Sequence, residues 1–500
     1  MPSVTHSHLS RFTKLALAGS AALSLAACAT VPGAGIAPGS PITAAEAQQG
    51  AQYHPQFIAE FGGQMTGPYA QYVESVGQGI AVQSGLATTP GAFNVTLLNS
   101  SVNNAFAVPG GYVYVTRQLV GLMNNEAELA AVLGHEVGHV AARHSARRQA
   151  AAQRNQLGGL GVAILSSVLL GGDNPLGQQI AETAMQGSQL LTLSYSRGQE
   201  IEADNLGVQY LTRAGYDPRS MATLLQSLAA QNSLDAQLQG RNDATMPAWA
   251  STHPDPASRV QNALAQAQAT GAGGVTNREV FMRRIDGLTY GDDPAQGVIE
   301  GSQFIHPDLR LSFTAPQGFY MVNGTSAVSI NGDAGRAQLT TAAFDGNLEN
   351  YVRTAFRTLG GQQQQLAPQN MQRTTVNGIQ AVFGGARVNN GQQEVDVTVF
   401  AYDFGGGRAY HFAAITPAGQ AGVFNSMYNS MSRITAQQAA QVVPRVIDIV
   451  TAARSDTVQT LARRMAYTDA QEARFRVLNG MSGSDAVVPG QQYKIVVRSN

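Results

Sequence analysis

The chain is poor in cysteine and in charge. One cysteine, Cys28, stands among 500 residues, so no disulfide can form within the chain. Charged residues make up only 13%, against roughly 25% in typical globular domains. The 31 basic and 32 acidic residues leave a formal charge of −1 at pH 7. Without an excess of basic residues, the sequence excludes the electrostatic pattern of a nucleic-acid-binding protein.

Long apolar runs are also missing. The stretch from Leu15 to Ala27 is shorter than the ~20 residues that an ordinary transmembrane helix needs. It follows two basic residues and ends at Cys28, as a bacterial lipoprotein signal does. We therefore expect a signal peptide over 1–27 and a lipid on Cys28; the alternative is a cysteine placed there by chance. Because Ala29 follows rather than aspartate, we expect anchoring to the periplasmic face of the outer membrane.

The most informative motif is His135-Glu136-Val137-Gly138-His139, inside a helix that a capping-box sequence opens at Asn125. Two histidines at i and i+4 share one helical face, so both imidazoles can reach one zinc ion. Glu136 points beside the metal, where a carboxylate can take a proton from the attacking water and pass it to the leaving amine. The alternative is a pair of histidines that bind no metal.

A catalytic zinc needs three protein ligands and one open position. Glu200 and Asp204 lie at i and i+4 of a second predicted helix and share a face. Glu200 could be the third ligand, and Asp204 could accept a hydrogen bond from a ligand histidine; equally, both carboxylates could be solvated. Glu202 faces elsewhere. His144 is at i+5 from His139, so we expect a surface histidine there.

Taken together, H-E-x-x-H and the later S-R-x-x-E-x-x-A-D, which ends at Asp204, resemble metallopeptidase family forty-eight. That family contains the CAAX prenyl protease, the HtpX heat-shock peptidases and the BepA-type periplasmic peptidases. The resemblance implies zinc on His135, His139 and Glu200, with Glu136 as general base and acid and Asp204 behind a ligand histidine.

The resemblance extends to the segments 104–115 and 252–254. His253 corresponds to a histidine that in BepA-type members can take the fourth zinc position and keep the enzyme latent. A loop histidine that bonds substrate or backbone is the alternative. Tyr112, Val113 and Tyr114 form a predicted strand, and such a strand near the active helix can bind an extended peptide at its edge.

Length and composition favour several domains. We expect a multidomain protein: a mainly α, zincin-type (gluzincin) peptidase domain with a small sheet, then an α+β domain, then a small β-α-α-β module. Alternation at Val395, Val397 and Val399 predicts strands in the α+β part. The apolar segment 157–170 is a buried helix or hairpin, or else a loop that faces a membrane or a partner. The predicted boundaries are a signal peptide 1–27, a flexible tether 28–50, a peptidase domain 51–268, a linker 269–303, an α+β domain of unknown role 304–434 and a LysM-like module 446–497.

The last of these segments resembles a LysM module in three stretches, 455–465, 475–480 and 489–496. LysM modules fold β-α-α-β and bind the N-acetylglucosamine backbone of peptidoglycan. Ser455 stands where the usual pattern has glycine. Glycan binding is one expectation, and packing against neighbouring domains without any glycan is the other.

These observations predict a periplasmic endopeptidase that uses one zinc ion per chain. By resemblance, its substrates are unfolded, misfolded or stalled envelope and outer-membrane proteins. BepA-type members often carry tetratricopeptide repeats, and no 34-residue repeat is visible here. Two alternatives stay open: a non-proteolytic scaffold that links the outer membrane to peptidoglycan, and a peptidase that acts on peptidoglycan stem peptides.

Overall fold

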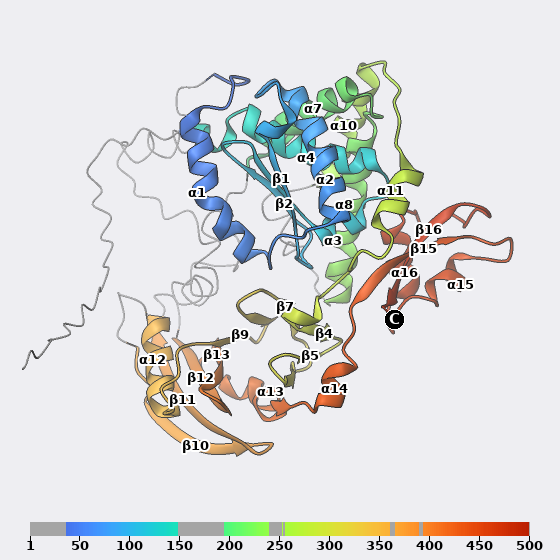
Figure 1. The fold of residues 1–500 in the computed structure, drawn as a ribbon. Helices are drawn as coiled ribbons and strands as arrows, with labels where there is room; N and C mark the ends of the chain where they lie inside the picture. Colours follow the sequence, from blue (N-terminus) through green and yellow to red (C-terminus); the bar gives the residue numbers. More distant parts are fainter. Residues whose placement is uncertain are drawn as a thin grey trace, which may run out of the picture.

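The computed structural model describes residues 37–148, 195–239, 253, 256–360, 366–389 and 394–499. The predicted signal peptide, Cys28 and the apolar segment 157–170 lie outside these ranges. Within them, no helix combines the length and apolarity needed to cross a membrane. Helices and several sheets form three neighbouring parts of the molecule (Figure 1).

The first part combines a small sheet with layers of helices on both of its faces. The sheet has the order β1-β3-β2, with β1 parallel and β2 antiparallel to the central strand. Its elements are α1 (Ala44–Glu60), α2 (Pro68–Ala81), β1 (Asn94–Leu98), β2 (Ala105–Val108), β3 (Tyr112–Thr116), α3 (Arg117–Leu122), α4 (Glu126–Ala141), α7 (Arg197–Ala214), α8 (Ser220–Leu238) and α10 (Pro256–Ala269).

Helix α4 carries the histidine motif and is buried along its whole length. Its N-cap, Asn125, accepts a hydrogen bond from the Glu128 backbone N–H at 2.9 Å, as its sequence predicts. Two glycines let α7 approach closely. A Cβ atom on Gly138 would lie 3.0 Å from the Ala203 carbonyl oxygen, and one on Gly207 would lie 3.3 Å from the His135 backbone nitrogen. The two helices therefore pack almost backbone to backbone.

The predicted substrate strand, Tyr112 to Tyr114, is the wrong strand for edge addition. It lies in β3, which pairs with β1 on one side and β2 on the other, so both of its hydrogen-bonding edges are used. Tyr114 packs under α1 against Phe57 and Phe106. The edge strands of this sheet are β1 and β2. Residues 63–65 bond to the outer edge of β1 near Leu98, so among the described residues the outer edge of β2 is the more open of the two.

The predicted tether also ends earlier than expected. Helix α1 begins at Ala44, with a capping box between Thr43 and Glu46. Glu46 is buried and forms a 2.6 Å ion pair with Arg143, just beyond the end of α4. Because a buried ion pair holds its two elements in one arrangement, residues 44–50 belong to the helical unit and not to a flexible tether.

The predicted linker 269–303 is an ordered part of the fold. It contains α11 (Arg278–Ile285), which buries Phe281 and Met282. The following residues bond to a strand near the C-terminus of the chain. The Gly287 backbone N–H donates to the Ile447 carbonyl at 2.8 Å, and the Tyr290 N–H donates to the Arg445 carbonyl at 2.9 Å. This segment packs between the first part and the C-terminal sheet. The Gly-rich start suggested a linker, but contacts with these distant residues order the segment.

The second part contains two antiparallel sheets. The larger has the order β10-β11-β12-β13-β9-β8-β7 and the smaller β14-β6-β5-β4. Helix α12 covers one face of the larger sheet (Figure 1). The elements are β4 (Val298–Glu300), β5 (Gln303–His306), β6 (Leu311–Thr314), β7 (Tyr320–Asn323), β8 (Val328–Gly332), β9 (Gly335–Thr341), α12 (Leu348–Gly360), β10 (Asn370–Val376), β11 (Ile379–Asn389), β12 (Glu394–Gly405), β13 (Arg408–Pro417), α13 (Asn425–Ser430), β14 (Ser432–Arg433) and α14 (Ala436–Ala440).

The third part has the element order β-α-α-β. It consists of β15 (Arg445–Thr451), α15 (Val458–Ala462), α16 (Gln471–Leu478) and β16 (Gln492–Arg498), with the two strands antiparallel. This part packs against the first (Figure 1): Ile447, Leu461 and Phe475 belong to the same apolar core as Leu129 of α4. Glycan binding by this module stays a prediction.

A buried lysine joins the third part to the first. Lys494 is fully buried, and its Nζ donates to the carbonyls of Gly121, Leu122 and Met123 at 2.9, 3.1 and 2.6 Å. Burial lowers the pKa of Lys494 well below its usual value, while Glu128 opposes that shift. Three carbonyl partners match the three N–H bonds of an ammonium group. Lys494 thereby caps the C-terminal end of α3, immediately before α4.

We predict that Lys494→Met lowers the free energy of unfolding by about 2–4 kcal/mol, because it removes the donor that three buried carbonyls at the end of α3 share, of which that of Leu122 keeps a 3.4 Å bond from Asn124 Nδ2. Chemical denaturation of the purified protein measures this loss. Arg463→Met, at an exposed position of the same module, is the matched control and should change stability by less than about 0.5 kcal/mol. Equal stability of the two variants would contradict this role of Lys494.

Candidate metal centre

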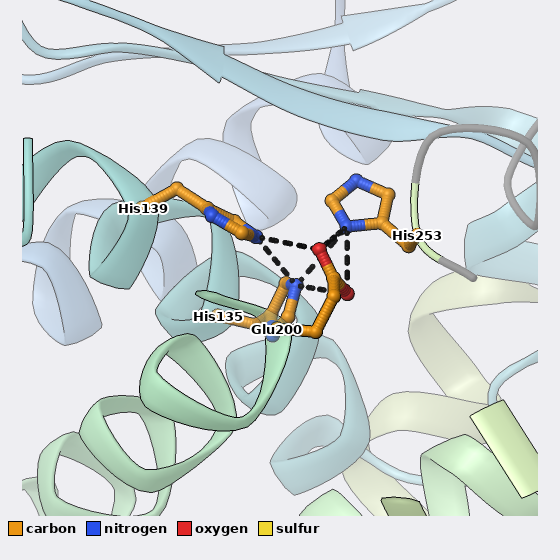
Figure 2. A group of neighbouring side chains, drawn as sticks. All are labelled: His135, His139, Glu200 and His253. Carbon is orange, nitrogen blue, oxygen red and sulfur yellow. Dashed lines mark hydrogen bonds and ion pairs between the residues drawn. The ribbon is translucent and has the colours of Figure 1, made fainter. Parts of the chain in front are cut away.

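Four buried side chains from three segments converge on one point (Figure 2). Helix α4 supplies His135 and His139, α7 supplies Glu200, and His253 precedes α10. One ligand atom from each lies within 4.8 Å of all the others. The Nε2 atoms of His135 and His139 are 3.0 Å apart, and His253 Nδ1 lies 3.1 Å from Glu200 Oε1. This is the set of residues that the sequence singled out as metal ligands.

Glu200 reaches the centre because α7 begins at a defined residue. Ser196 caps α7 and forms a capping box with Gln199, so Glu200 lies in the first turn. One turn later, Asp204 Oδ1 lies 2.9 Å from His135 Nδ1. The side chain of Asp204 therefore holds His135 with Nε2 turned toward the centre, as predicted from the i, i+4 spacing.

Arg259 of α10 completes the centre, and sequence reasoning missed it. Its guanidinium donates to both oxygens of Asp204, at 2.7 and 2.6 Å, and also to Glu200 Oε2. Burial opposes its charge, but Asp204 outweighs burial and raises the pKa of Arg259. The arginine lies 55 residues from Asp204 in a helix of mostly small and amide residues, so no local pattern marks it. The sequence offers one weak signal for Arg259: it is a basic residue shortly after His253 in a chain with few charged residues.

The charges of the centre do not balance among the protein groups alone. Three buried carboxylates, Glu136, Glu200 and Asp204, face one guanidinium, Arg259. Uncompensated buried charge is costly, and a divalent cation would neutralise carboxylate charge that Arg259 does not balance. Within the described residues, Glu136 Oε1 has no hydrogen-bond partner. Imidazole and carboxylate donors with this charge fit a divalent metal ion.

Burial also sets the protonation of the key groups. It raises the pKa of Glu136, with His253 and His135 opposing the shift. A carboxylate with a raised pKa is a better proton acceptor near neutral pH. Burial lowers the pKa of His139 well below its usual value, which keeps its imidazole neutral, as a metal ligand must be. Burial opposes the charge of Glu200, but His253 and His139 outweigh it and hold the pKa of Glu200 well below the usual range.

His144 was predicted to lie on the surface, and that prediction is wrong. It is fully buried, and its Nδ1 lies 2.7 Å from His139 Nδ1. The i+5 argument assumed a continuous helix, but α4 ends at Ala141 and Arg143 adopts a left-handed conformation with φ of 56°. This turn redirects the chain and brings His144 back beneath His139.

The edge strand β2 reaches the same region. Ala107 of β2 and Pro109, just after it, line a hollow together with His139 and Tyr195. The Tyr195 ring stacks on the His139 ring with centroids 3.8 Å apart and an interplanar angle of 16°. Strand β2 therefore lies near His139, one of the four converging side chains.

Comparison with known proteins agrees with this geometry. Residues 69–267 match the family model of Peptidase family M48. The chain is 37% identical over 195 residues to a beta-barrel assembly-enhancing protease of Yersinia pestis, covering 39% of this chain and 38% of that protein. It is 32% identical over 240 residues to the protein of that name in Escherichia coli, covering 47% and 46%.

A mitochondrial metalloendopeptidase OMA1 of Arabidopsis thaliana is 37% identical over 137 residues, covering 27% of this chain and 26% of that protein. The chain thus spans less than half the length of these relatives. The matched residues include α4, α7 and residue 253, which together supply the four converging side chains. Over residues 69–267, this chain is therefore similar to the metallopeptidases of family M48.

Proposed function

We propose that this chain is a zinc-dependent endopeptidase of the bacterial periplasm. The observation that carries the proposal is the buried convergence of His135, His139 and Glu200 with Glu136 beside them. Two imidazoles, one carboxylate and a neighbouring second carboxylate are the parts that hydrolysis of a peptide bond by one zinc ion requires.

The position of each residue in the centre indicates its role in the reaction. His135, His139 and Glu200 would hold the zinc ion, which supplies Lewis acidity and makes water a stronger acid when it is bound. Glu136 accepts the proton of the attacking water and returns it to the leaving nitrogen. Asp204 and Arg259 keep His135 and Glu200 in place through their hydrogen bonds.

His253 supports a latent state of the enzyme. Its Nδ1 lies 3.2 Å from His135 Nε2 and its Nε2 lies 3.4 Å from Glu136 Oε1, so its ring stands between the ligands and the general base. Burial opposes charge on His253, but Glu200 and Glu136 outweigh it and raise its pKa. A ring in this place occupies the position that the attacking water needs. Hydrolysis would then require His253 to move away.

For substrates, we propose unfolded or misassembled envelope proteins bound along the open edge of β2. Main-chain hydrogen bonds to a strand give affinity with little selection of side chains, which suits varied unfolded clients. The names of the relatives point to proteins of β-barrel assembly as the client class. The signal-like segment and Cys28 support a lipid anchor at the outer membrane.

The C-terminal β-α-α-β module could bind peptidoglycan while it is docked on the peptidase. Its element order supports the LysM resemblance. Shared core residues tie it to α4, so a glycan bound there would hold the peptidase at a fixed place relative to the cell wall.

We predict that Glu136→Gln lowers hydrolysis of unfolded casein by at least about 100-fold while zinc stays bound one per chain, because the amide cannot accept the proton. Turnover by gel assay and zinc by atomic emission measure the two quantities. Glu74→Gln, an exposed carboxylate on α2, is the control and should retain full activity. Chelation should abolish activity, and added zinc should restore it. Full activity in Glu136→Gln would overturn the assignment, and zinc binding without cleavage of any protein substrate would favour the scaffold alternative.

We predict that His253→Ala raises casein hydrolysis, because it frees the position opposite Glu136. If the ring occupies this position in about nine of ten molecules, activity rises about tenfold. His306→Ala, the same substitution in the second part of the molecule, should leave activity unchanged. Unchanged or reduced activity in His253→Ala, with zinc still bound, would refute latency.

A further inference from the structure

The two ligand histidines are held from behind in different ways. His135 donates directly to Asp204, a buried carboxylate. His139 contacts a second imidazole instead, that of His144. The other nitrogen of His144, Nε2, lies 3.1 Å from Glu202 Oε2, and the Glu202 side chain is 41% exposed. A chain of three groups thus runs from His139 to the protein surface.

We propose that His144 and Glu202 are positioning residues that orient His139 as a metal ligand through this chain of hydrogen bonds. The proposal rests on the proposed zinc site and deepens it. It assigns a role to two residues that the sequence motifs did not place at the zinc site: His144, predicted to lie on the surface, and Glu202, predicted to face away from the metal.

The proton positions follow from the geometry. His139 Nε2 faces the centre, 3.0 Å from His135 Nε2 and 3.3 Å from Glu200 Oε1, so a metal would take the lone pair of this nitrogen. In a neutral imidazole the proton then lies on Nδ1. His139 Nδ1–H donates to His144 Nδ1, and His144 must carry its own proton on Nε2, where it donates to Glu202. One tautomer of each ring satisfies all three groups.

The local backbone is built to present His144 in this way. The left-handed turn at Arg143 ends α4 and places His144 under His139, and Arg143 is locked by its ion pair with Glu46. Gln199 of α7 donates to the His144 carbonyl at 3.4 Å. Because Tyr195 stacks on the His139 ring, the ring plane and the hydrogen bond together fix its orientation.

Glu202 also meets Arg147, whose Nη1 lies 3.0 Å away and whose side chain is 49% exposed. The side chain of Arg147 donates to Glu202. Among the described residues, it makes no hydrogen bond to the side chain of His144 or His139. This arrangement supplies a matched control. Loss of Arg147 removes the surface ion pair and a 3.3 Å hydrogen bond to the Ala142 carbonyl, and it leaves the hydrogen bonds between His139, His144 and Glu202 in place.

The test is the zinc dissociation constant of the full chain, measured by chelator competition for the parent, His144→Leu, His144→Asn, Glu202→Ala and Arg147→Ala. Loss of such an outer partner typically weakens metal binding by 10–100-fold. We expect His144→Leu to weaken binding within that range. His144→Asn should recover at least half of the loss on a logarithmic scale, since its Oδ1 can accept from His139. We expect about tenfold weaker binding for Glu202→Ala and a change within about threefold for Arg147→Ala.

The visible spectrum of the cobalt-substituted protein gives a second readout, because it reports the ligand field at the metal. We expect it to shift in His144→Leu and Glu202→Ala and to match the parent in Arg147→Ala. Equal losses of affinity in His144→Leu and His144→Asn would overturn the role of His144 as an acceptor. Equal effects of Glu202→Ala and Arg147→Ala would overturn the role of Glu202, and since both residues are exposed, misfolding does not confuse this comparison.

The outcomes separate this proposal from the proposed function. A parent protein that binds no zinc would overturn both. A parent that binds zinc and cleaves no protein would overturn the endopeptidase alone, and the affinities would still decide the role of His144 and Glu202.

Discussion

The close packing of α4 on α7 is the contact on which the centre depends. Glycines at 138 and 207 let the two backbones approach to a distance at which a Cβ atom would be crowded. Only at this separation can His135 and His139 on one helix and Glu200 on the other reach the same point. The rest of the first part supports this pair: the sheet covers one side, and α8 and α10 cover another. The ligand geometry is therefore a property of the helix packing.

Burying this much charge creates a second constraint. Three carboxylates and an arginine lie out of contact with solvent, so their partners must be supplied from within the protein or by a bound cation. Arg259 neutralises one charge and fixes two of the acids. The two ligand histidines differ in their hydrogen-bond partners. His135 contacts the buried carboxylate of Asp204, whereas His139 connects through His144 to Glu202 at the surface. Both ligand histidines are therefore held, His135 by a buried carboxylate and His139 through His144 and Glu202.

Local sequence patterns predicted the residues of the centre well, because helical spacing decides which side chains share a face. His135, Glu136, His139, Glu200 and Asp204 lie where their i, i+4 spacing places them, and His253 joins them as the resemblance implied. Features that depend on the chain turning or meeting a distant segment were missed. His144 returned through the left-handed turn at Arg143, and Arg259 arrived from another helix.

The same division applies to the fold. Strands in the second part and the β-α-α-β order of the third followed from residue periodicity and resemblance. The central place of β3 depends on which strands pair, and the ordered segment 269–303 depends on docking of the third part. Neither pairing nor docking is encoded in a short window of sequence, since both are set by contacts between residues far apart along the chain.

The most direct test of the account is X-ray absorption at the zinc edge on the purified, resting protein. The account predicts one zinc per chain, with imidazole nitrogens at about 2.0–2.1 Å from three histidines and one carboxylate oxygen. That shell would place His135, His139, Glu200 and His253 around the metal together. Absence of bound zinc, or a shell of oxygen ligands without imidazole, would contradict the assignment of the centre.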